Sequence, residues 1–208
     1  MLRLLSFILI AFMLPLTLHA AEQLGPSQKI PAGGVLRGNF TEDHYFTNSP
    51  KPLRSEGQFL VAPGRGILWV VQKPLPLTFV FTPQGMAQSF GGLPYVQTPA
   101  TRLPVIAQIS GLIGSAMAGD WDALDKIFVV SLSQTPRGWI ASLTPRSQKS
   151  GLPFSILTAE GSKFVEAAKA TRLDGGTDTF TFFNEMVAHT PPTMAELTAF
   201  AVVKGQNP

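Results

Sequence analysis

The chain begins with one continuous apolar run before its pattern changes. Residues 4–18 are almost all hydrophobic and follow the basic Arg3, and Leu18-His19-Ala20 ends in the small residue that signal cleavage requires. The run is shorter than the roughly twenty residues needed to span a bilayer. The pattern predicts a cleavable signal peptide over residues 1–20 and one domain over residues 21–208.

Short segments rich in β-branched and aromatic residues follow, separated by Pro or Gly clusters. They are spaced by about ten residues, as in an antiparallel meander or barrel. The predicted strands are Val35–Phe46, Gly57–Ala62, Ile67–Gln72, Leu77–Thr82, Gly85–Phe90, Lys126–Ser133, Gly138–Thr144, Phe154–Ala159, Lys163–Arg172 and Thr177–Phe183.

Near the middle of the chain the hydrophobic period changes from two to that of a helix. Pro104 suits a first helical turn, and Gly119-Asp120 suits an end, so the pattern predicts a helix over residues 104–118. The apolar positions of this helix fall close to i, i+3, i+7 and i+11. They are Ile106, Ile109, Ile113 and Met117. We expect this face to cover the sheet as a lid. An apolar helix face of this kind is more often packed permanently in the core than part of a gate that opens.

Alternation within the strands assigns side chains to faces, because successive residues of a strand point to opposite sides. Leu77, Phe79 and Phe81 point one way, and similar alternation in the other strands extends the same apolar face. The residues predicted to line it are Phe59, Val61, Ile67, Trp69, Val71, Leu77, Phe79, Phe81, Met86, Phe90, Phe180 and Phe182.

So many strands in one sheet must curl or close. We therefore predict a mainly β fold with few helices, in which a curved antiparallel sheet forms an incomplete, half-open β-barrel covered by a helical lid. The concave face of such a barrel would be hydrophobic. It could hold a ligand, or it could be filled by the protein's own side chains, as in any small barrel.

The composition narrows the class of protein. Hydrophobic residues make up 45% and charged residues 14% of the chain, which excludes intrinsic disorder. The formal net charge of +3 is spread out rather than gathered in a basic stripe, so we expect no nucleic-acid partner. Cysteine is absent, which rules out both a disulfide framework and a lipid anchor on cysteine.

No motif points to an enzyme. The sequence lacks a Gly-x-Ser-x-Gly elbow, a phosphate-binding loop and a His-Glu-x-x-His motif. Glu42 and His44 share one face of a strand and could bind a metal or act as a base, but two ligands make no metal site. Asp120, Asp122 and Asp125 follow a helix end, where capping is common. We predict no catalytic activity, metal or cofactor, with a lipid-processing hydrolase as the least favoured alternative.

The order of several weak motifs resembles the LolA-like outer-membrane lipoprotein carrier proteins over nearly the whole mature chain. The early strands carry most of the resemblance, and two later strands also fit. The matching runs are Leu36–Glu42, Pro52–Phe59, Gly66–Trp69, Pro74–Met86, Gly138–Pro145 and Asp178–Phe182.

The resemblance implies a periplasmic carrier in a Gram-negative bacterium. Its cavity would shelter the acyl chains of a lipoprotein, and it would contact membranes transiently as it passes its cargo from an inner-membrane donor complex or exporter to an outer-membrane acceptor. A monomer is expected. The main alternative is a non-catalytic envelope β-domain that binds a protein partner.

Three departures from the family pattern bear on the cargo. Glu42 stands where the family commonly has Gln, and Ala62-Pro63-Gly64-Arg65 replaces a basic-Pro element, so Arg65 could take over the family arginine's contact with lid or partner from a shifted position. A Gly- and Pro-rich lead-in replaces the family's first helix. The cargo could therefore be a glycolipid, a free fatty acyl group or another envelope lipid.

Overall fold

The computed structural model describes residues 25–26, 28–102, 104–118, 120–147 and 151–203. The predicted signal peptide lies outside these residues. In chain order the strands are β1 Val35–Tyr45, β2 Leu53–Ala62, β3 Gly66–Lys73, β4 Leu77–Thr82, β5 Gly85–Phe90, β6 Val96–Pro99, β7 Phe128–Thr135, β8 Gly138–Pro145, β9 Phe154–Gly161, β10 Val165–Arg172 and β11 Thr177–Ala188. The helices are α1 Pro104–Ala118, α2 Trp121–Asp125 and α3 Met194–Ala201.

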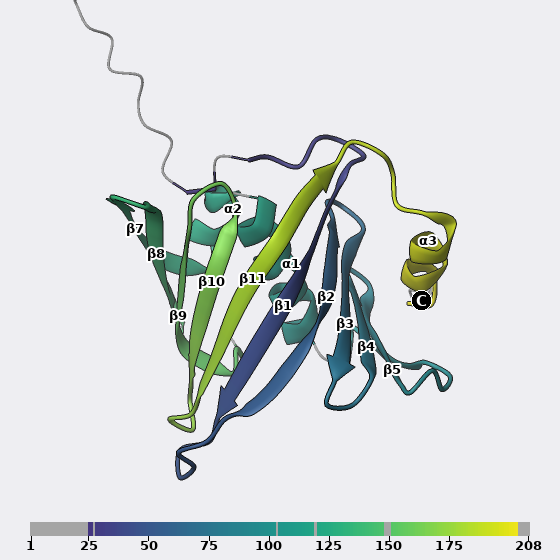
Figure 1. Ribbon diagram of the computed structural model, residues 1–208, viewed down its shortest axis with the longest axis horizontal. Coiled ribbons are helices and arrows are strands. Elements are labelled where there is room, and N and C mark those ends of the chain that lie inside the picture. The colour runs from purple at the N-terminus through teal and green to yellow at the C-terminus, as the bar shows by residue number, and fades with distance from the viewer. Residues whose placement is uncertain (1–24, 27, 103, 119, 148–150, 204–208) are drawn as a thin grey trace, which may run out of the picture.

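All the strands join one curved, antiparallel, 11-stranded sheet (Figure 1). Its order is β6-β5-β4-β3-β2-β1-β11-β10-β9-β8-β7, and β6 and β7 do not pair with each other, so the sheet stays open. The first and last strands of the chain meet in the middle, where Phe40 pairs with Phe182. The predicted mainly β fold, with an open curved sheet and a helix against it, is confirmed.

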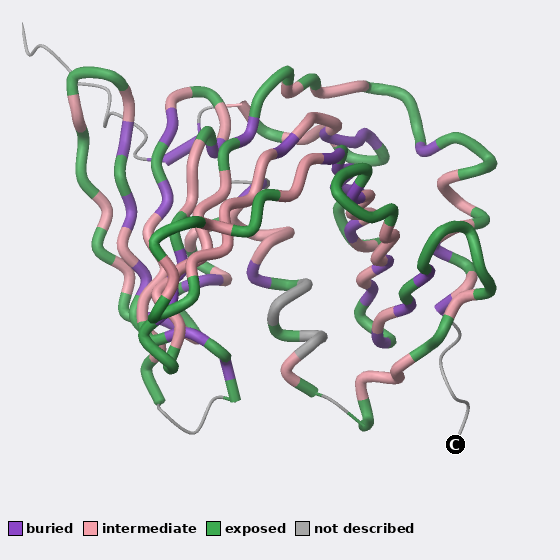
Figure 2. The backbone as a smooth tube through the Cα atoms, turned by 60° about the horizontal axis from the view of Figure 1, so that its bottom comes forward, coloured by how far each residue is buried: buried purple, intermediate pink, exposed green. Residues whose placement is uncertain are grey.

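The helices lie on opposite sides of the sheet. In Figure 1, α1 and α2 lie behind β1 and β11, inside the curve, whereas α3 lies on the outer side. Along the strands, buried positions alternate with more exposed ones (Figure 2), as a sheet with two different faces requires. We call the side that faces α1 the concave face and the other the convex face.

The main core fills the concave face. Phe40, Ile67, Phe128 and Leu143 are almost completely buried there, and Leu112 and Met117 of α1 pack against the same cluster. Chain segments far apart in sequence therefore share one core.

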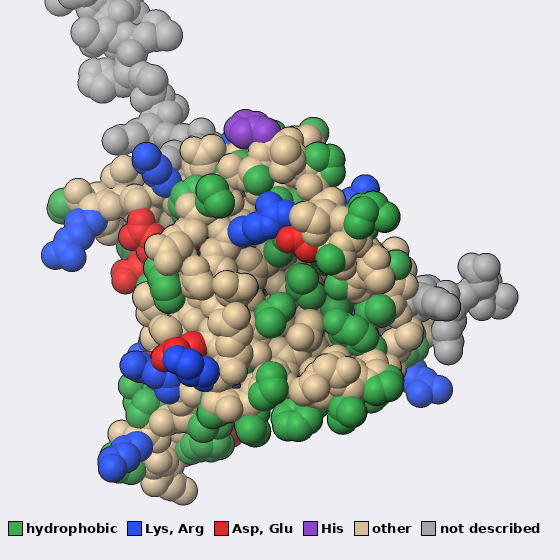
Figure 3. All heavy atoms as spheres, turned by 45° about the vertical axis from the view of Figure 1, so that its right-hand side comes forward, with side chains coloured by type: hydrophobic (Ala, Val, Ile, Leu, Met, Phe, Trp, Pro, Cys, Tyr) green, Lys and Arg blue, Asp and Glu red, His purple; other side chains and the backbone are tan. Residues whose placement is uncertain are grey.

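A smaller core lies under α3 on the convex face. Phe200 packs with Leu60 and Val80 of the sheet. Arg37 Nη2 donates to Glu196 Oε2 at 2.7 Å, which ties the helix to β1. The Glu196 carboxylate also accepts from the backbone N–H of Thr193 in a capping box. Figure 3 brings this side forward: hydrophobic side chains gather right of its centre and along its lower edge, among polar side chains and backbone, and a group of basic and acidic side chains lies in its upper middle.

Three elements were not predicted from the sequence, and two strands, β2 and β11, are longer than predicted by four or five residues. These elements are β6, α2 and α3. β2 starts at Leu53 and β11 runs to Ala188 because both follow the whole length of β1. The expected capping role of the aspartates holds for Asp120, whose side chain accepts from the backbone N–H of Ala123 at the start of α2.

Candidate functional site

The pairing of β2 to β5 gathers the predicted apolar residues on the concave face. Residues directly opposite each other in neighbouring strands share a face. Phe59 pairs with Trp69, and Trp69 pairs with Phe79. The same register places every predicted residue of these four strands on one side: Phe59, Val61, Ile67, Trp69, Val71, Leu77, Phe79, Phe81, Met86 and Phe90.

Aromatic rings form the centre of this face. The rings of Phe40 and Trp69 stack with centroids 3.8 Å apart. Phe180 and Phe182 of β11 meet Trp69 edge to face at 6.0 and 6.2 Å, which agrees with the face that alternation predicted. Phe40 was not predicted to line this face. The signal for it was present, because Phe40 is four residues from the apolar Leu36 and so lies on the same face of the strand.

Part of the aromatic face stays uncovered. Phe59 and Ile67 are buried, but Trp69, Phe79 and Phe81 are only partly buried, and Phe90 near the β6 edge is 47% exposed. Tryptophan is rarely buried completely, but phenylalanine commonly is, so the exposed parts of the three Phe rings are surface that a fully packed interior would cover. The face therefore retains apolar surface that can be covered further.

Helix α1 crosses the half of the concave face formed by β2 to β5. Met117 is buried in the main core, and Ile113 is partly buried against it. The side chains of Ile106 and Ile109 lie outside the described residues. Two of the four predicted lid residues are thus placed on the sheet, and the gating role of the helix stays a prediction.

A hollow of about 390 Å³ separates part of α1 from the sheet. This volume falls within the range of small-molecule pockets, about 300–1,000 Å³. The lining residues are mostly small or apolar: Val61, Ala62, Pro63, Gly64, Gly66, Ile67, Pro83, Gly111, Gly114, Ser115 and Asp120. A Cβ at Gly111, which is exposed, or at Gly114, which is partly buried, would meet no atom within 4 Å, so both glycines border open space.

Arg65 lies in the turn between β2 and β3, next to this hollow. Its backbone N–H donates to the Ala62 carbonyl at 3.0 Å, and its side chain is exposed. Pro63, Gly64 and Gly66 of the same turn line the hollow. The predicted contact of Arg65 with a lid or partner stays a prediction.

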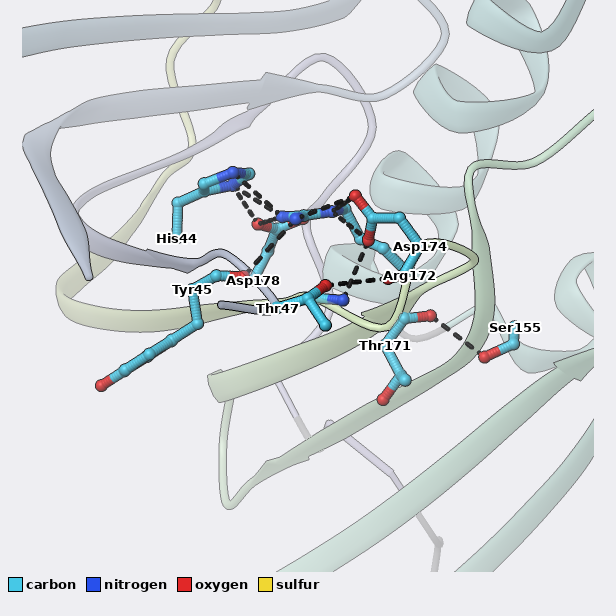
Figure 4. A network of polar contacts seen from close by, with 9 residues as sticks. His44, Tyr45, Thr47, Ser155, Thr171, Arg172, Asp174 and Asp178 are labelled. Atoms are coloured by element: carbon cyan, nitrogen blue, oxygen red, sulfur yellow. Dashed lines mark hydrogen bonds and ion pairs between the residues drawn. The ribbon is translucent and has the colours of Figure 1, made fainter. Parts of the chain in front are cut away.

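A polar cluster lies where the concave face ends near the tip of β1. His44 Nδ1 is 2.5 Å from Asp178 Oδ1, and Arg172 Nη1 donates to the same oxygen at 2.8 Å. Arg172 also donates through Nε to Asp174 at 3.1 Å and through Nη2 to the carbonyl of Tyr45. Figure 4 shows these side chains pointing toward one another: His44 comes from β1, Arg172 from β10, Asp174 from the turn that follows it, and Asp178 from β11.

Glu42 lies between this cluster and the aromatic centre. It pairs with Phe180 in the register of β1 and β11, and it is the next residue after Phe40 on the same face. Burial raises the pKa of the Glu42 carboxyl above its ordinary value; the negative charge of Asp178 adds to this, and His44 opposes it. The side chain of Glu42 has no hydrogen bond or ion pair within the described part of the chain.

Sequence reasoning found Glu42 and His44 but not their neighbours. Asp178 and Arg172 join them only through strand pairing between distant segments, for which the sequence carries no local signal. Among the described residues no group of three or more His, Asp or Glu side chains could hold a metal ion. The same part of the chain contains no helix that is long and apolar enough to cross a membrane.

No protein-family model matches the chain, and no curated protein matches it. Solved structures align with the fold at low sequence identity. They include LolA superfamily proteins. One from Nitrosomonas europaea is 5% identical, with a TM-score of 0.45 over 81% of this chain and 91% of that chain.

Two further neighbours have similar scores. A chain of the MucA/MucB complex from Pseudomonas aeruginosa is 15% identical, with a TM-score of 0.45; the match covers 85% of this chain but only 59% of that one. A DUF1329 family protein from Desulfovibrio piger is 10% identical, with a TM-score of 0.44 over 80% of this chain and 92% of that chain.

The unpaired Glu42 leads to a pH-dependent stability prediction. Since its pKa is raised in the folded protein, ionised Glu42 destabilises the fold at a pH above the folded pKa, and this cost disappears below the ordinary value of 4.5. Glu42→Gln is therefore expected to raise the free energy of unfolding at about pH 8, with a gain that shrinks toward pH 4. Urea unfolding across this pH range measures it.

Glu160→Gln is the matched control, because Glu160 is exposed on β9. Its effect should stay within about 0.5 kcal/mol at every pH. A loss of stability in Glu42→Gln at high pH, or a gain independent of pH, would contradict the prediction.

Proposed function

We propose that the protein is a periplasmic carrier that shelters the acyl chains of a lipoprotein or another envelope lipid on its concave face. In this proposal it shuttles the cargo from an inner-membrane donor to an outer-membrane acceptor. The observation that carries the proposal is the partly uncovered aromatic face beside an open hollow under α1.

The chemistry of the face supports an acyl ligand. Trp69, Phe79 and Phe81 offer apolar surface without charge, and Val61 and Ile67 continue it into the hollow. A flexible hydrocarbon chain needs apolar contact but no hydrogen bonds, which matches such a lining. The signal-like segment at residues 1–20 supports export from the cytoplasm.

The expected energy is sufficient to keep a lipid out of water. Each buried methylene contributes about 0.8 kcal/mol, so a single long acyl chain gains on the order of 10 kcal/mol before the costs of binding are subtracted. The surface that remains exposed on the rings of the concave face would be covered in the same step. A carrier of this kind needs no catalytic group.

Lipid extraction tests the proposal directly. Protein purified from the periplasm of its native host should yield acylated lipid when extracted with organic solvent and analysed by mass spectrometry. The matched control is protein synthesised in the absence of membranes. After incubation with envelope lipid, this protein should bind the lipid. A protein that neither retains nor takes up lipid would instead be an envelope domain with a filled interior.

Phe79→Glu tests the aromatic face. A buried carboxylate at the centre of the acyl surface is costly, so the variant should lose most of its affinity for a fluorescent fatty-acid probe while remaining folded. Phe183→Glu is the control, because Phe183 is 41% exposed on the convex face of β11. Unchanged probe affinity in Phe79→Glu would overturn the assignment of this face.

Gly114→Leu tests the hollow. The new side chain has free space in front of it and should occupy the hollow, lowering affinity for the fatty-acid probe at least about tenfold. Because Gly in a helix interior costs about 1 kcal/mol relative to Ala, neither this variant nor the control Gly114→Ala should destabilise the protein. Gly114→Ala should retain binding; equal affinity in both variants would show that the ligand lies elsewhere.

A further inference from the structure

The concave face changes from aromatic to polar within one step along β1. Phe40 lies at the aromatic centre, Glu42 is the next residue on the same face, and His44 follows. Their partners on β11 repeat the change, from Phe182 through Phe180 to Asp178. An amphiphile whose chain lies over the rings would therefore place its headgroup beside Glu42.

The charges of this end do not balance. The carboxylates of Glu42, Asp174 and Asp178 outnumber the two basic groups, Arg172 and His44. The guanidinium of Arg172 already donates to Asp178 and Asp174. His44 contacts Asp178 as well. The carboxylate of Glu42 is left without a hydrogen bond or ion pair to any described residue. The cluster therefore holds an excess of negative charge beside an apolar surface.

A partly buried carboxylate without a partner lowers the stability of the fold. Proteins retain such unfavourable side chains mainly at functional sites. A ligand ammonium group would complement it, because an N–H donor carrying positive charge forms the stronger, charge-assisted hydrogen bond with a carboxylate. A ligand carboxylate or phosphate would instead meet the charge of Glu42 and Asp178 unfavourably.

We infer that Glu42 is the headgroup residue of the site, and that the protein prefers amphiphiles with a primary ammonium group close to the acyl chain. This inference rests on the proposed function, since it assigns the polar end of the same ligand. Asp178 adds to the negative potential, and Arg172 positions Asp178 rather than binding the ligand.

The test compares three probes with the same hydrocarbon chain: dodecylammonium, dodecanol and dodecanoate. Each competes with a fluorescent fatty-alcohol probe, which carries no charge, at about pH 8, where dodecylammonium and dodecanoate are both charged. The wild-type protein should bind dodecylammonium about tenfold more tightly than dodecanol, and dodecanoate most weakly. Glu42→Gln should bring dodecylammonium to the affinity of dodecanol and leave dodecanol unchanged.

Asp43→Asn is the matched control. Asp43 is the next residue of β1, faces the convex side and pairs with Arg54, so its loss removes the same charge from outside the site and should preserve the preference. Equal binding of dodecylammonium and dodecanol by the wild type, or equal weakening of all three probes in Glu42→Gln, overturns the headgroup assignment alone. Failure of every probe to bind overturns the proposed function together with it.

Discussion

The pairing of β1 with β11 is the contact on which the rest of the molecule depends. It joins the strands β1 to β6 to the strands β7 to β11, and no other strand pairing in the described chain links these two halves. Without it, Phe40 would have no Phe182 beside it, and the concave face would be divided into two shallow sheets. Since His44 and Asp178 are 134 residues apart in sequence, this pairing closes a long loop at a large entropic cost. The aromatic contacts around Trp69 and the ion pairs at the strand ends offset that cost on both sides of the β1–β11 pairing.

The sequence was informative where one residue and its near neighbours decide the structure. The alternation of Leu77, Phe79 and Phe81 placed these residues on the correct face of β4, and the spacing of apolar residues located α1. Helix α3 was missed although Thr193 and Glu196 have the spacing of a capping box, because its short apolar stripe covers only a small core around Phe200. β6, with four residues, is too short for any period to appear.

The polar cluster could not be found in this way. Glu42 and His44 were visible as a pair on one strand, but the meaning of the pair depends on Arg172 and Asp178, which the register of β1, β10 and β11 brings beside them. Local patterns do not encode that register; it follows from burying the apolar residues of all three strands on one side. Whether a carboxylate is paired is therefore a property of the folded chain, and the absence of a partner for Glu42 became visible only there.

The two glycines of α1 affect more than the volume beneath them. Each lowers the intrinsic tendency of the segment to be helical by about 1 kcal/mol relative to Ala. The helix is consequently held by Leu112 and Met117 against the sheet more than by its own backbone. A cargo in the hollow beside Gly111 and Gly114 would contact α1 at positions where an added Cβ meets no atom within 4 Å. The helical order of α1 and the binding of cargo in the hollow would then reinforce each other. Release of the cargo would make α1 less ordered.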